Sequence, residues 1–134
     1  MKAIKSLFAV CLILISAFAA SCSGNNEFTG NRIKNPDYYL LDIEFMTGTD
    51  EYTLTLKGGD MLSVEFVTTE GSLKTEIKDS DGEIVYSGNG KEANTFTVNV
   101  KKDGEYVIRV EANKAKGKVE IKKRVSNQAY TLLK

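Results

Sequence analysis

Apolar and polar residues alternate along most of this 134-residue chain from residue 38 onward. A period of two indicates β-strands with one buried and one solvated face. Residues with helical spacing over ten or more positions do not occur after the first 21 residues, so the pattern predicts an all-β fold. The alternation appears in eight runs, at residues 38–45, 51–57, 62–66, 73–77, 84–86, 95–101, 105–111 and 118–124.

Segments rich in glycine and aspartate separate these runs where hairpin turns are expected. The segments are Gly58-Gly59-Asp60, Asp79-Ser80-Asp81-Gly82 and Lys102-Asp103-Gly104, in which Gly supplies the positive φ of tight turns. Short strands with one apolar face must bury that face against a second sheet. Residues 38–134 are therefore predicted to form an antiparallel β-sandwich of about eight strands.

The first 21 residues have the features of a secretory signal peptide. Lys2 and Lys5 precede an apolar stretch over residues 7–15, and residues 17–21, small except for Phe18, follow it. The apolar stretch is shorter than the roughly 20 residues of a membrane-spanning helix. We therefore expect an exported protein from which residues 1–21 are removed.

The segment Ala19-Ala20-Ser21-Cys22 resembles the lipobox of bacterial lipoproteins, with Ala19 where Leu is commonest. This resemblance implies that Cys22 is lipidated and becomes the new N-terminus. Two or more acyl chains hold a protein stably on a bilayer. The expected location is the outer face of the cytoplasmic membrane or the outer membrane. Residues 22–37, rich in Gly, Asn and Ser, are predicted to be a flexible tether between the lipid and the folded domain.

Processing changes the composition on which chemistry depends. Removal of the signal leaves 16 basic against 18 acidic side chains, no His, and no cysteine besides Cys22. The mature domain therefore has neither a disulfide nor a thiol nucleophile. A mildly acidic chain without a basic patch also argues against a nucleic-acid partner.

Catalytic motifs are missing from the sequence. Without His, Gly-x-Ser-x-Gly or a phosphate-binding loop, only paired carboxylates remain, and nearly all of these fall on predicted solvent faces or turns. We therefore expect that the protein is not an enzyme and has no cofactor.

One turn has a spacing that suits a metal ion. Asp79 and Asp81 offer hard oxygen ligands for Ca²⁺, although Gly82 comes fourth in the segment rather than sixth as in an EF-hand. The same residues also make an ordinary hairpin turn that needs no ion.

A polar sheet face is the other candidate site. Carbohydrate-binding sandwiches place aromatic rings beside such polar residues, whereas most aromatic residues here point inward by parity, so β-propensity alone also explains the threonines. The residues that would share the polar face are Thr53, Thr55, Thr95, Thr97 and Asn99.

The C-terminal residues 126–134, with Tyr130, Leu132 and Leu133, are predicted to cover a sheet edge or to contact a partner.

Four outward aliphatic residues allow two interpretations. They are either one protein-binding patch or scattered surface residues, depending on the strand order. These residues are Leu40, Val67, Val85 and Val107.

Residues 95–110 and 117–121 resemble the closing strands of bacterial prepeptidase C-terminal domains and of GOLD-like β-sandwiches. In all of them an aromatic and alternating β-branched residues precede a Gly-x-Tyr, here Gly104-Glu105-Tyr106. The Tyr52 to Asp60 segment and the Leu73 to Tyr86 hairpin fit the same layout. The resemblance implies a jelly-roll-like accessory module for binding or interaction.

Together these features predict a cell-envelope lipoprotein that acts as a non-catalytic binding module. The membrane is reached through the lipid, and the partner is a protein or a glycan. Alternatives are a carbohydrate-binding module and an inhibitor or assembly factor of an envelope enzyme.

Overall fold

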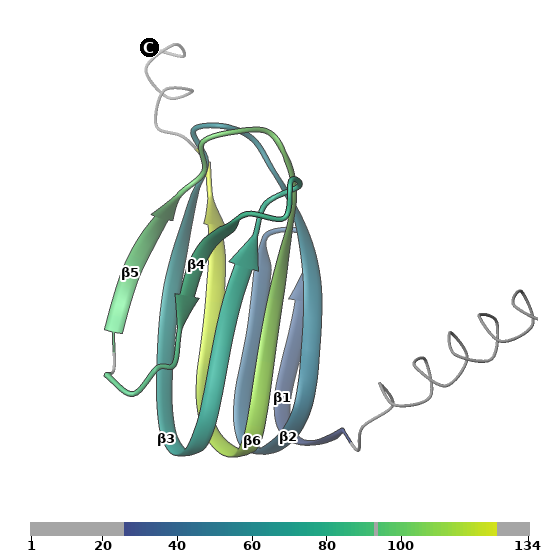
Figure 1. The fold of residues 1–134 in the computed structure, drawn as a ribbon, viewed down its shortest axis with the longest axis vertical. Coiled ribbons are helices and arrows are strands. Elements are labelled where there is room, and N and C mark those ends of the chain that lie inside the picture. The colour runs from purple at the N-terminus through teal and green to yellow at the C-terminus, as the bar shows by residue number, and fades with distance from the viewer. Residues whose placement is uncertain (1–25, 93, 126–134) are drawn as a thin grey trace, which may run out of the picture.

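A computed structural model describes residues 26–92 and 94–125, which form an all-β fold (Figure 1). All strand pairs are antiparallel, in the order β1-β2-β6-β3-β4, and β5 pairs with β3. The all-β, antiparallel prediction is confirmed, but the described residues form six strands rather than about eight. The strands are β1 (Glu27–Asn35), β2 (Tyr38–Leu56), β3 (Met61–Lys78), β4 (Ile84–Gly88), β5 (Asn94–Asn99) and β6 (Gly104–Arg124).

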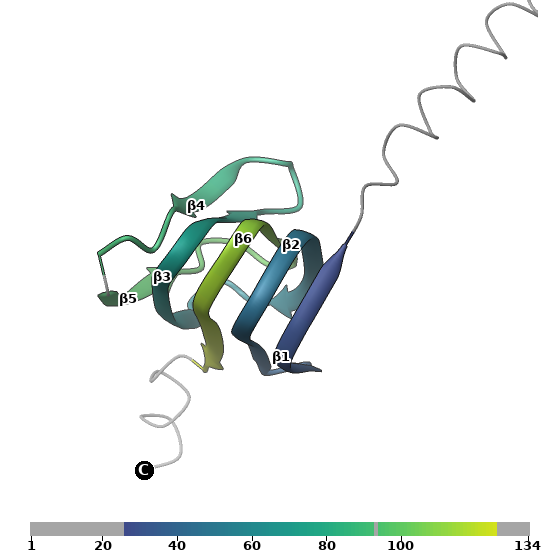
Figure 2. The same ribbon diagram turned by 90° about the horizontal axis from the view of Figure 1, so that it is seen from below.

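The difference in number arises because three long strands bend back on themselves. A straight strand of the 21 residues of β6 would span roughly 69 Å. Its two ends, however, pair with Leu56 and Met61, which are five residues apart and at most roughly 18 Å from each other. Strand β6 must therefore fold over, and β2 and β3 fold with it (Figure 2). Each long strand contains two of the predicted runs.

The bend divides the sheet into two layers that are hydrogen-bonded through the same strands. The first layer contains β1, β5 and residues 38–46, 61–68 and 115–124. The second layer contains β4 and residues 48–56, 72–78 and 104–112. Inward residues of both layers form one hydrophobic core, which includes Leu41, Phe66 and Val119 from the first and Leu54 and Ile108 from the second.

Register shifts mark the bends and change which side chains are buried. In β2 the pairing with β6 shifts between Ile43 and Met46 and again before Gly48. A bulge inserts an unpaired residue and reverses the alternation beyond it. Parity with Ile43 predicts that Phe45 faces the core, but Phe45 is 39% exposed and Met46 is 2% exposed, so that prediction is wrong.

The sheet begins earlier than the sequence suggested. Strand β1 lies within the predicted tether of residues 22–37 and pairs with β2 from Asn35–Tyr38 to Glu27–Thr47. The tether prediction is therefore wrong for residues 27–35. Gly30 allows the close pairing, because its φ is +140° and an added Cβ would lie 2.0 Å from the carbonyl oxygen of Asp42.

Only one of the three predicted hairpin turns joins neighbouring strands. Residues 79–83 connect β3 to its partner β4. Residues 57–60 connect β2 to β3, which lie on opposite sides of β6, and residues 100–103 connect β5 to β6, which lie on opposite sides of β3. These two connections cross between the layers, and the amide of Gly59 joins them by donating to the carbonyl of Val100 at 2.9 Å.

The outward aliphatic residues do not form one patch. Leu40 and Val67 lie in the first layer and are separated by β6, while Val85 and Val107 lie in the second layer. Leu40 is only 8% exposed and pairs with Ile33 of β1. This distribution favours the interpretation as scattered surface residues.

Candidate functional site

The predicted lipidation site, Cys22, lies outside the described residues, as does the C-terminal segment 126–134. In the part of the chain that the structure describes, no helix is long and apolar enough to cross a membrane.

The Asp79 turn forms a closed network of hydrogen bonds and ion pairs. Oδ1 of Asp79 accepts hydrogen bonds from the amides of Asp81 at 2.9 Å and Glu83 at 3.0 Å. The ammonium of Lys102, from the connection between β5 and β6, lies 3.3 Å from Oδ2 of Asp79 and also contacts the carboxylate of Asp81. A cationic side chain therefore already lies between the two carboxylates proposed to bind Ca²⁺.

The charges in this turn agree with that arrangement. Burial alone would raise the pKa of Asp79, but the hydrogen bonds from Glu83, Lys102 and Asp81 outweigh it and hold the pKa below its ordinary value. The same contacts with Asp81 and Asp79 raise the pKa of Lys102, so its ammonium stays charged. Among residues 26–92 and 94–125, no group of three or more Asp, Glu, Cys or His side chains could hold a metal ion.

The five polar residues predicted to share one face lie on opposite sides of the molecule. Thr53 and Thr55 are on β2 in the second layer, beside a depression of about 330 Å³ that Tyr52 also lines. Thr95, Thr97 and Asn99 are on β5, the outer strand of the first layer. The prediction of a single polar face is therefore wrong.

A larger hollow lies on the side where β4 and β5 are located. Its volume is about 830 Å³, within the range of small-molecule sites. Strands β4 and β5 both pair with β3, but with different halves of it, so they belong to different layers and leave an opening between them. The polar residues Thr97 and Asn99 line this hollow together with the aromatic residues Tyr86 and Phe96.

The two aromatic residues are half-buried at this opening. Tyr86 and Phe96 point inward by parity, as predicted, but no further strand covers them in the described part of the chain. Their ring centroids are 4.8 Å apart with the planes tilted by 43°. Burial raises the pKa of Tyr86, so its hydroxyl is protonated at neutral pH and available as a donor.

The loop after β4 is fixed against the rim of the hollow. The amide of Thr68 donates to the carbonyl of Gly90, and the Thr68 hydroxyl donates to the carbonyl of Asn89, both at 2.7 Å. A Cβ on Gly90, where φ is +66°, would lie 2.5 Å from the ring of Phe66. Only glycine therefore lets this loop approach the core so closely.

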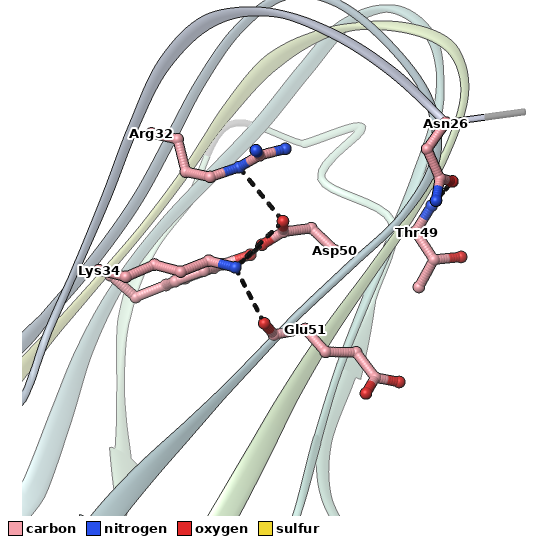
Figure 3. A network of polar contacts seen from close by, with 7 residues as sticks. Asn26, Arg32, Lys34, Thr49, Asp50 and Glu51 are labelled. Atoms are coloured by element: carbon pink, nitrogen blue, oxygen red, sulfur yellow. Dashed lines mark hydrogen bonds and ion pairs between the residues drawn. The ribbon is translucent and has the colours of Figure 1, made fainter.

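A charged cluster closes the opposite side of the molecule (Figure 3). Arg32 and Lys34 of β1 each lie 3.2 Å from the carboxylate of Asp50 on β2, and Lys34 also donates to the carbonyl of Glu51 at 3.0 Å. Near the bend, the side-chain carbonyl of Asn26 accepts a hydrogen bond from the Thr49 amide at 3.0 Å. Inward-pointing charges protect an edge strand from pairing with other chains. The cluster is therefore structural, linking β1 to the second layer.

Sequence reasoning missed both the hollow and this cluster. The composition of residues 27–35 predicts a tether rather than a strand, so no inward parity is predicted for Arg32 and Lys34. A signal for the hollow was present, since neither Ile84–Gly88 nor Asn94–Asn99 contains a charged residue. Edge strands usually carry charged residues, which keep them from pairing with other chains.

Comparison with protein-family models finds no match, and comparison with curated proteins finds no related sequence.

Proposed function

We propose that this protein is an exported lipoprotein of the bacterial cell envelope that acts as a non-catalytic binding module. The observation that carries the proposal is the segment Ala19-Ala20-Ser21-Cys22 directly after the apolar stretch of the signal. Lipidation of Cys22 anchors the protein to the outer face of the cytoplasmic membrane or to the outer membrane.

The early start of the sheet supports a close and oriented attachment. Only four steps of chain separate Cys22 from Asn26, a reach of roughly 14 Å when extended. Asn26 is hydrogen-bonded to Thr49 at the bend of β2. Anchoring at Cys22 therefore places the bent end of the strands nearest the lipid and turns the connections at residues 57–60 and 100–103 away from it.

The contacts that the buried carboxylates make within the fold support a binding role rather than catalysis. Asp50 is paired with Arg32 and Lys34, and Asp79 with Lys102. The carboxylate of Asp60 accepts the amide of Lys57 at 2.9 Å. Each buried carboxylate is thus engaged in holding the fold, which leaves it poorly suited to general acid or base catalysis.

The folded sheet is best classed as a jelly-roll-like β-sandwich whose two layers share three bent strands. The single core between the layers and the two connections that cross between them support this class. The resemblance of residues 95–121 to prepeptidase C-terminal and GOLD-like domains favours the same accessory role.

Membrane fractionation of a Cys22→Ala variant tests the proposal. We expect the variant to leave the membrane fraction, and globomycin to cause accumulation of the unprocessed wild type. Cys11→Ala is the matched control, because Cys11 lies in the apolar stretch that is removed, and it is expected to fractionate like the wild type. Retention of Cys22→Ala in the membrane fraction would contradict the lipid anchor.

A further inference from the structure

The two strands that border the hollow, β4 and β5, differ in charge from the two broad faces of the molecule. On the first layer Lys118 pairs with Glu120 at 3.0 Å, and on the second Arg109 pairs with Glu51 at 3.1 Å. Both faces carry pairs of opposite charges. Strands β4 and β5 contribute only uncharged side chains to the hollow, and its charged lining residues, the exposed Lys91, Glu92 and Lys101, come from the loops beside these strands.

The lining combines two kinds of chemistry. Tyr86 and Phe96 provide half-buried aromatic surface, and Asn94, Thr97 and Asn99 provide hydroxyl and amide groups that both donate and accept hydrogen bonds. By parity Tyr86 and Phe96 point inward, whereas Thr97 and Asn99 point outward, so the sequence pattern assigns them to different faces. The open side of the sandwich brings both to one hollow.

We propose that this hollow binds an uncharged glycan segment, whose rings contact Tyr86 and Phe96 and whose hydroxyls bond to Thr97, Asn94 and Asn99. This inference rests on the proposed function of a non-catalytic binding module and names its ligand class. A sugar ring has apolar C–H surfaces and a rim of hydroxyls, which is the pattern that the lining complements. The strand residues that would contact the ligand are neutral, and the charged lining residues Lys91, Glu92 and Lys101 are exposed, so a neutral ligand can bind to the strands without burying a charge there.

The hollow is large enough for such a ligand and is held open by fixed backbone. Its volume of about 830 Å³ suits more than one sugar ring. The loop at Asn89 and Gly90 is bonded to Thr68, so the rim is formed before a ligand arrives. A preformed site loses less entropy on binding.

The first experiment screens the detergent-purified full chain on an array of neutral and charged oligosaccharides. We expect binding to neutral glycans, whose affinity is then measured by calorimetry with the best neutral oligosaccharide. Tyr86→Leu and the double variant Thr97→Ala/Asn99→Ala are expected to weaken binding at least tenfold. Tyr86→Phe, which keeps the ring, is expected to weaken it less than Tyr86→Leu.

The matched control is the double variant Thr53→Ala/Thr55→Ala, which removes similar groups from the opposite side. It is expected to bind within twofold of the wild type, and thermal melting checks that all variants are folded. A screen in which no neutral glycan binds overturns the proposal, as does equal binding by Tyr86→Leu and the wild type. If a truncation after Val125 abolishes binding, the ligand binds to the C-terminal segment instead, which overturns the proposal. If the protein forms dimers through β5 that block glycan binding, the hollow is occupied by a second copy of the chain, which also overturns it. Loss of membrane association in Cys22→Ala is read separately, so the lipid anchor and the glycan site fail independently.

Discussion

The phenolic hydroxyl of Tyr39 donates a hydrogen bond of 2.6 Å to Oδ2 of Asp50, and both side chains are buried. Tyr39 lies in the first layer and Asp50 in the second, on either side of the bend in β2. Burial, and next the hydrogen bond to Asp50, raise the pKa of Tyr39 far above its usual range, so the hydroxyl remains a donor at neutral pH. The hydrogen bond between Tyr39 and Asp50 therefore joins the two layers on the inside of the bend.

Replacement of Tyr39 by Phe is expected to lower the free energy of unfolding by about 1.5–3 kcal/mol, the usual contribution of a hydrogen bond to a charged group. The ring of Tyr39 still stacks on Tyr52, so packing is retained. Urea denaturation measures the change. Tyr38→Phe, on the outer face, is the matched control with an expected change below about 0.5 kcal/mol. Equal stability of Tyr39→Phe and the wild type would show that Arg32 and Lys34 alone satisfy Asp50.

The alternation of residues was sufficient to predict the class of fold and most of the core. Leu41, Leu54, Val64, Ile108 and Ile121 are all buried as their parity requires. Parity is a local property of a pleated strand, and for this reason it can be read from a single run.

What the sequence did not reveal depends on events between the runs. Nothing in residues 46–50 distinguishes a turn from a bulged bend, so the pattern predicts two strands in place of β2 and places Phe45 in the core. Residues 27–35 lack apolar alternation because inward Arg32 and Lys34 meet Asp50 rather than the core. The meeting of Tyr86 with Thr97 in one hollow depends on strand order, which a single sequence does not encode locally.

Truncation of Met46 tests the bulge in β2 directly. Met46→Ala is expected to cost about 2–5 kcal/mol, because a buried side chain is removed and a cavity remains. Phe45→Ala, one residue earlier and 39% exposed, is expected to cost less than about 1 kcal/mol. Unfolding in urea compares the two variants. A larger loss for Phe45→Ala would mean that the alternation continues unbroken to residue 45.

Stability in acid is expected to depend on Asp79. Its pKa is lowered in the folded protein from an ordinary value of 3.8, so the ionised form stabilises the fold at neutral pH. This contribution is lost as the pH falls below that ordinary value and through the folded pKa. Asp79→Asn is therefore expected to flatten the dependence of unfolding free energy on pH below about 4. Lys102→Met, which removes one of the lowering contacts, is expected to give an intermediate slope. An unchanged slope in both variants would assign the acid sensitivity to other carboxyl groups, such as Glu120, whose pKa is also lowered.

Calcium is expected to leave the melting temperature of the wild type unchanged. The ammonium of Lys102 already contacts both carboxylates of the turn, and two backbone amides engage Oδ1 of Asp79. A ligand that binds the folded state raises its melting temperature, which makes thermal melting with and without millimolar Ca²⁺ the measurement. Magnesium serves as the control for ionic strength. A rise specific to Ca²⁺ would restore Asp79 and Asp81 as metal ligands.

The hydroxyl of Thr75 is buried without a hydrogen-bond partner, and it is the only such side-chain polar group among the described residues. Its residue is completely buried in β3, between Gly88 of β4 and Val110 of β6. An unsatisfied buried hydroxyl costs about 1–3 kcal/mol, and valine has nearly the same shape without it. Thr75→Val is therefore expected to raise the free energy of unfolding by about 1 kcal/mol, measured in urea. Thr75→Ser, which keeps the hydroxyl and loses the methyl group, is expected to lower it. Destabilisation by Thr75→Val would show that the hydroxyl has a partner in solution, such as a bound water.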